Sequence, residues 1–210
     1  MFRHLRHLQQ HQSTGGFVER VTGEFLEMLD LAETMFVDVC IRLLDHQREP
    51  HLGDRIYDID ARINQLEKTI RRQIVEHLAL QPKADLPICL ALMSLVKDAE
   101  RLGDYIKNLY QVDQVLDAPI DNNHFTTYFG SMSEDIKALF QTTRTVLTED
   151  LLEATHETRE QAHRIEKTCD EIIARLAHCD LTVNEAVAFT LTARHFKRAA
   201  AHLNNILTSV

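Results

Sequence analysis

Apolar residues recur along the chain at alternating steps of three and four, the spacing of one face of an α-helix. Six runs follow this spacing, and they cover residues 18–39, 56–70, 92–109, 125–146, 162–176 and 189–210. No stretch of comparable length alternates with the two-residue period of a β-strand. The pattern therefore predicts an all-α protein with six long helices.

Turn-forming residues divide the six runs into two sets of three. Pro50 and Gly53 separate the first two runs, and Pro82 and Pro87 bracket the start of the third. The most loop-like stretch is Asp-Ala-Pro-Ile-Asp-Asn-Asn at 117–123. Long helices with short connections pack as antiparallel neighbours, which favours two tandem three-helix bundles. The expected boundaries are a loose N-terminal tail at 1–16, a first bundle at 17–116, a linker at 117–123 and a second bundle at 124–210.

The third and sixth predicted helices carry similar polar residues, 97 positions apart. Arg101 corresponds to Arg198, and Asn108 corresponds to Asn205. Between them, small residues and ring-bearing residues also match in register. Matched polar residues arise by chance less easily than matched apolar ones, so the two halves are interpreted as repeats.

Composition and charge narrow the functional classes. The 210 residues are 44% hydrophobic with 6 Gly and 4 Pro, which suits a helical core and disfavours a turn-rich all-β fold. No apolar run approaches the roughly 20 residues that span a bilayer, and no secretory signal pattern opens the chain. The net charge of -9 argues against a nucleic-acid binder, which needs a basic face. An acid excess also suits cation binding, although solvated surface explains most such excesses.

The cysteines lack the C-x-x-C spacing of redox or zinc sites. The chain contains Cys40, Cys89, Cys169 and Cys179, and the first three lie among apolar residues. Such cysteines behave as small buried hydrophobes. We therefore expect free thiols, a reducing cytoplasmic location and no structural zinc.

Glu100 and Asp104 stand four positions apart, so both carboxylates project from one face of the third helix. Gly103 lies between them and costs about 1 kcal/mol relative to Ala, which indicates a close approach to the helix backbone. The two acids repel each other by a few tenths of a kcal/mol, a penalty that a bound cation would remove. The alternative is a solvated face on which Arg101 and Lys107 are the neighbours.

The second helix offers Asp60, Asn64 and Glu67 along the edge of its apolar stripe. Oxygen ligands of this kind suit Mg, Mn, Fe or Zn. The alternative is a boundary stripe paired with Arg71. On the fifth helix, Glu166 and Asp170 are spaced in the same way.

Other chemical motifs have weaker support. Two Glu-x-x-His motifs, at 153–156 and 160–163, resemble the ligands of di-iron bundles, but both fall in one predicted helix, whereas that chemistry needs two. The histidines at 4, 7 and 11 are better explained by a loose tail than by a metal site. The chain contains no P-loop, G-x-G-x-x-G, G-x-S-x-G or H-E-x-x-H pattern, so we expect no enzyme.

The third-helix sequence Lys97-Asp-Ala-Glu-Arg-Leu-Gly-Asp-Tyr-Ile-Lys-Asn-Leu109 resembles the signature helix of PhoU-type phosphate-uptake regulators, D-L-E-R-I-G-D-x-x-x-N-I. Arg194-His-Phe-Lys-Arg-Ala-Ala-Ala-His-Leu-Asn-Asn-Ile206 resembles the same helix in the second repeat of that family. The segments 60–67 and 165–172 resemble its helix-two pattern. The resemblance spans roughly residues 20–210.

This resemblance implies two tandem three-helix bundles and a non-enzymatic cytoplasmic regulator. Such proteins act by docking between a phosphate transporter and a sensor histidine kinase, and they restrain uptake or signalling when phosphate is plentiful. A homodimer is also expected. The alternatives are a metal-binding or metal-buffering helical bundle, an accessory regulator of a different transporter, and a bundle hydrolase or di-iron oxidase.

The E/D-x-x-x-D motifs of the family can bind metal ions, and the resemblance carries them onto the first repeat residue by residue. Glu100, Asp104 and Asp60 match, and Asn64 stands where the family has a second helix-two acid. The resemblance therefore implies a metal site at these four residues, for Fe, Zn, Mn or Mg. Arg101, Gly103 and Asn108, with Arg198 and Asn205 in the second repeat, are motif residues of structural importance.

The second repeat departs further from the family pattern. Glu166 and Asp170 match, but Lys197 and Ala201 replace the acids of the sixth helix. A lysine ammonium facing Glu166 and Asp170 would supply by salt bridge the charge that a metal would supply. We therefore expect a degenerate, metal-free second site, and a divergent member of the family.

Overall fold

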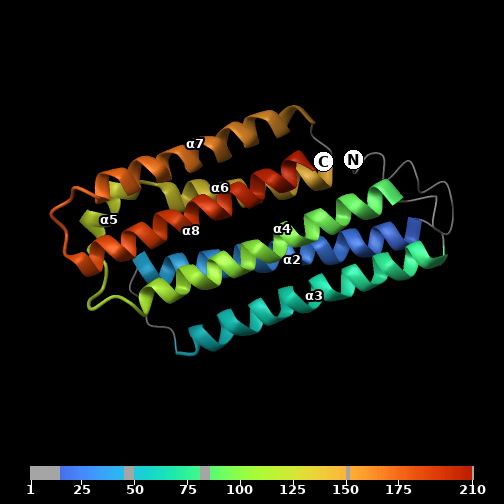
Figure 1. Cartoon of the computed structure of the whole chain (residues 1–210), viewed down its shortest axis with the longest axis horizontal. Helices are drawn as coiled ribbons and strands as arrows, with labels where there is room; N and C mark the ends of the chain where they lie inside the picture. The colour runs from blue at the N-terminus through green and yellow to red at the C-terminus, as the bar shows by residue number, and fades with distance from the viewer. Residues whose placement is uncertain (1–14, 45–49, 81–85, 150–151, 210) are drawn as a thin grey trace.

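The computed structural model describes residues 15–44, 50–80, 86–149 and 152–209. Within these ranges all regular structure is helical, as the apolar spacing predicts (Figure 1). The helices are α2 (Gly15–Leu44), α3 (Leu52–Leu80), α4 (Leu86–Asp113), α5 (Asn122–Phe129), α6 (Met132–Glu149), α7 (Leu152–Leu176) and α8 (Val183–Thr208). The predicted tail at 1–16 lies mostly outside the described residues, and α2 already begins at Gly15.

The predicted fourth helix is wrong in one respect, because the run at 125–146 is divided between α5 and α6. Gly130 ends α5 with φ 55° and ψ -124°, a conformation that side-chain-bearing residues rarely adopt. At the other end of α5, the Asp121 carboxylate accepts hydrogen bonds from the backbone N–H groups of Asn123 and His124, at 2.7 and 3.3 Å. The α5 helix therefore begins inside the segment predicted to be a linker.

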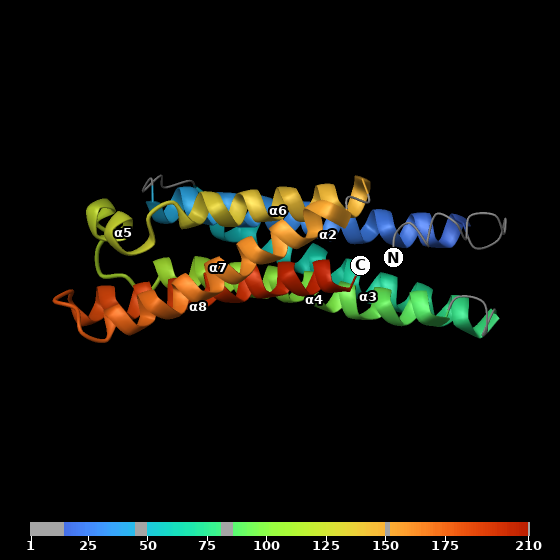
Figure 2. The same cartoon turned by 90° about the horizontal axis from the view of Figure 1, so that it is seen from above.

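The long helices form two three-helix bundles, α2–α3–α4 and α6–α7–α8, that lie against each other. The α4 helix packs along α8, and α2 packs against α6. Figure 1 shows α3 and α7 at opposite edges of the molecule. Figure 2 shows α2 and α6 on one side and α4 and α8 on the other, with α3 and α7 running obliquely between the two sides, so the third helices of the two bundles lie side by side.

One apolar core runs through both bundles. Phe36 of α2 is 1% exposed, and its ring lies 5.9 Å from that of Phe140 on α6 and 5.7 Å from that of Phe196 on α8. Phe129 of α5 contacts the same Phe196 ring at 5.8 Å. Side chains of both bundles thus share the same core, and the bundles form one packed unit.

The side-chain amide of Asn184 holds the segment that connects the two bundles. Asn184, in the first turn of α8, donates to the Val115 carbonyl at 2.7 Å and accepts from the Asp117 N–H at 3.0 Å. Next to it, His124 Nδ1 lies 2.8 Å from Glu185 Oε1. The segment that follows α4 is therefore held onto the start of α8.

Two further sequence predictions concern burial and membranes. Cys89 and Cys169 are completely buried, which confirms that they behave as small hydrophobes, and burial raises the pKa of Cys169 to about 12. All four cysteines lie in the described part of the chain, and none of them forms a disulfide. Within the described ranges, no helix combines the length and the apolar character needed to cross a bilayer.

Candidate functional site

The α3 and α4 helices approach closely at Gly103. A Cβ atom added there would lie 3.1 Å from Cδ1 of Ile63, closer than most side-chain contacts allow. This confirms that the mid-helix glycine marks a close approach to the backbone. The approach brings the predicted acids of α3 and α4 to one seam, which we name the first acidic seam and define by Asp60, Glu67, Glu100 and Asp104.

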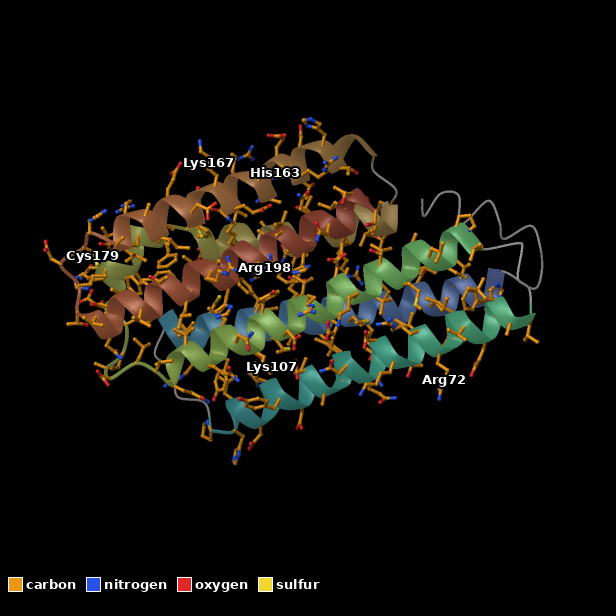
Figure 3. The ribbon with its side chains drawn as sticks, viewed as in Figure 1. Arg72, Lys107, His163, Lys167, Cys179 and Arg198 are labelled. Carbon is orange, nitrogen blue, oxygen red and sulfur yellow. The ribbon has the colours of Figure 1, made fainter. Side chains whose placement is uncertain are left out.

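Lys107 lies between the two helices at one end of the first acidic seam. Its Nζ donates to Asp60 Oδ2 at 2.8 Å and to Asp104 Oδ1 at 3.1 Å. Partial burial disfavours the charged lysine, but the hydrogen bonds and charges of Asp60 and Asp104 together outweigh it and raise the pKa of Lys107 above its usual value. Figure 3 shows Lys107 between α4 and α3.

Lys97 occupies the corresponding place at the other end of the seam. Its Nζ lies 2.7 Å from Glu100 Oε2 and 4.0 Å from Glu67 Oε1. Arg71 Nη1 contacts Glu67 Oε1 at 2.8 Å, and Arg101 Nε lies 3.9 Å from Glu100 Oε2. The side chains of Glu67 and Glu100 are only 11% and 12% exposed, so these ion pairs neutralise carboxylates that are largely removed from water.

The four predicted metal ligands do not converge on one point. Asp60 and Asp104 meet at Lys107, whereas Glu100 turns to Lys97. Asn64 directs its amide nitrogen toward Asp60 Oδ2 at 3.4 Å, and so acts as a donor. In the described part of the chain, no three His, Cys, Asp or Glu side chains are grouped so that they could hold a metal ion. The metal site stays a prediction, and the contacts favour its alternative, an ion-paired face with Lys107, Arg101 and Arg71.

The sequence predicts Lys107 only as a neighbour of the acids, and its position between Asp60 and Asp104 is apparent only in the structure. The i,i+3 spacing of Asp104 and Lys107 is a signal for one of its two contacts. Its contact with Asp60, 47 positions away, has no counterpart in the spacing.

In the second bundle, the predicted salt bridge of Lys197 forms with Asp170, whose two carboxylate oxygens both lie 2.6 Å from Nζ. Glu166 lies instead 3.6 Å from His163 Nδ1 on its own helix. The segments 153–156 and 160–163 both fall within α7, so the two Glu-x-x-His motifs share one helix as predicted.

The motif residues of α8 face α4, along a contact that we name the α4–α8 seam: Asp98 and Tyr105 of α4 with His195, Arg198, His202 and Asn205 of α8. Asp98 Oδ1 lies 2.8 Å from His202 Nδ1 and accepts from the Asn205 amide at 3.1 Å. The Tyr105 ring stacks on His202, and the Arg198 guanidinium lies 5.1 Å from the Tyr105 ring centroid. Figure 3 shows Arg198 on α8 where it meets α4.

Predicted motif residues of the two repeats therefore differ in role. Arg198 and Asn205 contact α4, whereas Arg101 is exposed and Asn108 is half-buried. Asp98 and His195 are not predicted from the sequence as site residues, and only the structure places them at the α4–α8 seam. Burial, with a smaller effect of the Arg194 charge, lowers the pKa of His195 to about 4, so its imidazole is neutral at pH 7.

The PhoU domain family model matches the chain twice, over residues 25–112 and 125–210. These two matches correspond to the two bundles. Three curated proteins are similar in sequence, and each is described as a phosphate-specific transport system accessory protein PhoU homolog.

The homolog from Aquifex aeolicus is 24% identical over 86% of this chain and 83% of its own length. That from Deinococcus radiodurans is 27% identical over 88% of both chains. The Synechocystis protein is 33% identical, over 45% of this chain and 42% of its own length.

Two solved structures share the fold. PhoU from Pseudomonas aeruginosa superposes with a TM-score of 0.78 at 19% identity, covering 93% of this chain and 95% of that one. The phosphate transport system regulatory protein PhoU from Streptococcus pneumoniae gives a TM-score of 0.79 at 16% identity, covering 91% of each chain. These likenesses extend the tandem-bundle fold over nearly the whole molecule.

Proposed function

The chain belongs to the PhoU domain family, and from this premise we propose that it is an accessory regulator of phosphate transport or phosphate signalling. The observation that carries the proposal is the double match of the family model, one copy on each bundle. The relatives from Aquifex and Deinococcus support it, because they align along most of the chain and are named as accessory proteins of phosphate-specific transport.

The regulator acts by docking and not by catalysis. Its partner is a component of a phosphate transporter or a sensor histidine kinase, and it works in the cytoplasm as a homodimer. Two features support docking: the long helices extend along the length of the molecule (Figure 2), and the acids of the candidate site are engaged in ion pairs. A metal on the first acidic seam is not needed for this mechanism.

Deletion of the gene tests the physiological role. In phosphate-rich medium, cells without the protein are expected to take up more labelled phosphate, or to keep phosphate-starvation signalling active, and the intact gene is expected to restore restraint. Unchanged phosphate uptake and signalling would refute the proposal. A change in the uptake of another solute would instead identify the regulator of a different transporter.

Binding of the purified protein to the transporter ATPase and to the cytoplasmic part of the kinase tests docking directly. Lys167→Glu on α7 and Arg72→Glu on α3 form a matched pair of charge reversals at opposite edges of the molecule (Figure 3). Each side chain is at least 70% exposed and lies 3.8 Å from a glutamate four residues later. A partner that docks at one edge loses affinity for one variant only. Absence of binding by the wild-type protein to either partner would contradict docking.

A further inference from the structure

Lysines of the third helix in each bundle contact acids that match the metal-binding motifs of the family. We propose that these ammonium groups take the place of a metal ion, so that the first acidic seam and the contact of Lys197 with Asp170 form without one, and that Lys107 is the residue that excludes divalent cations from the first acidic seam. The inference concerns this chain's own charges and does not depend on the proposed function.

The charge balance of the first acidic seam leaves no deficit for a cation to fill. Its four carboxylates all lie within 4.0 Å of a basic group, and those basic groups are Lys97, Lys107, Arg71 and Arg101. Four negative charges therefore face four positive ones. A divalent ion added to this arrangement would be repelled by the ammonium groups unless it displaced at least one of them.

A metal ion shared by Asp60 and Asp104 would have to displace the ammonium group of Lys107. One oxygen of each carboxylate, Asp60 Oδ2 and Asp104 Oδ1, is already hydrogen-bonded to Nζ, at 2.8 and 3.1 Å. Carboxylates are the right donors for a hard cation, but a lysine ammonium is a compact point charge with three donors and can serve both at once. The Asn64 amide nitrogen also faces Asp60 Oδ2, at 3.4 Å. The residues present therefore fit an ammonium group and not a metal ion.

The second bundle reaches the same result from a different position. Lys197 stands 97 residues after Glu100, where the first bundle has an acid, and it contacts both oxygens of Asp170. Lys107 corresponds instead to Asn204, by the same offset. Two lysines at non-equivalent positions thus join the second and third helices of their bundles. This supports lysine ammonium groups in place of metal ions in both bundles.

The wild-type protein provides the first test. We expect it to carry less than stoichiometric metal after purification without chelators, by elemental analysis. We also expect its melting temperature to be unchanged by EDTA or by added Mn²⁺, Zn²⁺, Fe²⁺ or Mg²⁺. A stoichiometric metal whose removal by EDTA lowers the melting temperature would overturn the proposal, whatever the variants do.

Lys107→Met tests the excluding role, because it keeps the length of the side chain and removes its charge. We expect this variant to melt at a lower temperature, and Mn²⁺ or Zn²⁺ to raise that temperature again. Lys68→Met, at an exposed position of α3, is the matched control and should respond to neither ion. Adding Asp60→Asn and Asp104→Asn to Lys107→Met should abolish the metal response.

If Lys107→Met does not fold, Lys107→Gln replaces it, since the glutamine amide can still donate to one carboxylate. Failure of the folded variant to bind Mn²⁺ or Zn²⁺ in a calorimetric titration would show that Lys107 does not exclude metal. Binding that persists when Asp60 and Asp104 are also changed would place the ion elsewhere and equally refute the assignment.

Discussion

Tyr105 of α4 stacks on His202 of α8, with ring centroids 5.4 Å apart and ring planes 21° apart. The two residues are separated by 97 positions, the offset that relates the two repeats, so equivalent positions of the repeats meet each other. The bundles therefore join through copies of the same helix face, antiparallel to one another, as Figure 1 shows for α4 and α8. The contacts of Asp98 with His202 and Asn205 also hold α4 against α8.

Replacing Asp98 with Ala should destabilise the protein by about 1–3 kcal/mol, because the change removes the partner of the largely buried His202, and the acceptor of the exposed Asn205 amide as well. Urea unfolding at pH 7 measures the loss. Asp58→Ala, at an exposed position of α3, is the control and should change the free energy of unfolding by less than about 0.5 kcal/mol. Equal losses in the two variants would show that the Asp98 contacts contribute little.

Phe36→Ala should cost about 3–5 kcal/mol, since this ring fills the core shared by α2, α6 and α8. The two bundles should still unfold in a single calorimetric transition, shifted to lower temperature. Val75→Ala, at a side chain that is 59% exposed, controls for the loss of apolar atoms at the surface. Two separate transitions in wild-type protein would contradict a common core.

Gly103→Ala gains about 1 kcal/mol of helix propensity but brings a methyl group to 3.1 Å from Cδ1 of Ile63. Ile63→Val removes that Cδ1 and alone should cost about 0.5–1.5 kcal/mol. The double variant is expected to be more stable than the sum of the single effects by at least about 0.5 kcal/mol. A double-mutant cycle in urea measures this difference, and strict additivity would mean that the two sites do not meet.

Acid should destabilise the protein through His195. Its pKa is about 4 in the folded state, below the ordinary value near 6.5, so between these values the unfolded chain binds a proton that the folded protein does not. Stability is therefore lost as the pH falls from 7 toward 4, with a slope of at most about 1.4 kcal/mol per pH unit, lessened by solvent at this partly exposed ring.

Unfolding of His195→Gln between pH 7 and pH 5 checks this dependence, because the variant should lose less stability than the wild type over that range. His156→Gln, on the exposed side of α7, should follow the wild-type curve. Parallel curves for all three proteins would assign the acid sensitivity to other groups.

The sequence predicted the helices well because the buried residues follow the apolar spacing. The division between α5 and α6 was not predicted, because the apolar spacing continues across it. Phe125, Phe129 and Met132 are all buried, although Gly130 separates two helices. The acids of the candidate site and their basic neighbours on the same helix were recognisable from the spacing, but their partners on other helices were not. Lys107 meets Asp60 and Asp98 meets His202 only because helices distant in the sequence pack together.

The contact of Asn184 with Val115 and Asp117 has a consequence for synthesis on the ribosome. The side-chain amide of Asn184 carries two N–H donors and a carbonyl acceptor, and it uses one donor and the carbonyl oxygen on the chain that leaves α4. Translation proceeds from the N-terminus, so some seventy residues must follow Val115 before Asn184 exists to hold it. The segment that leaves α4 can thus be held in place only after synthesis has reached the start of the last helix.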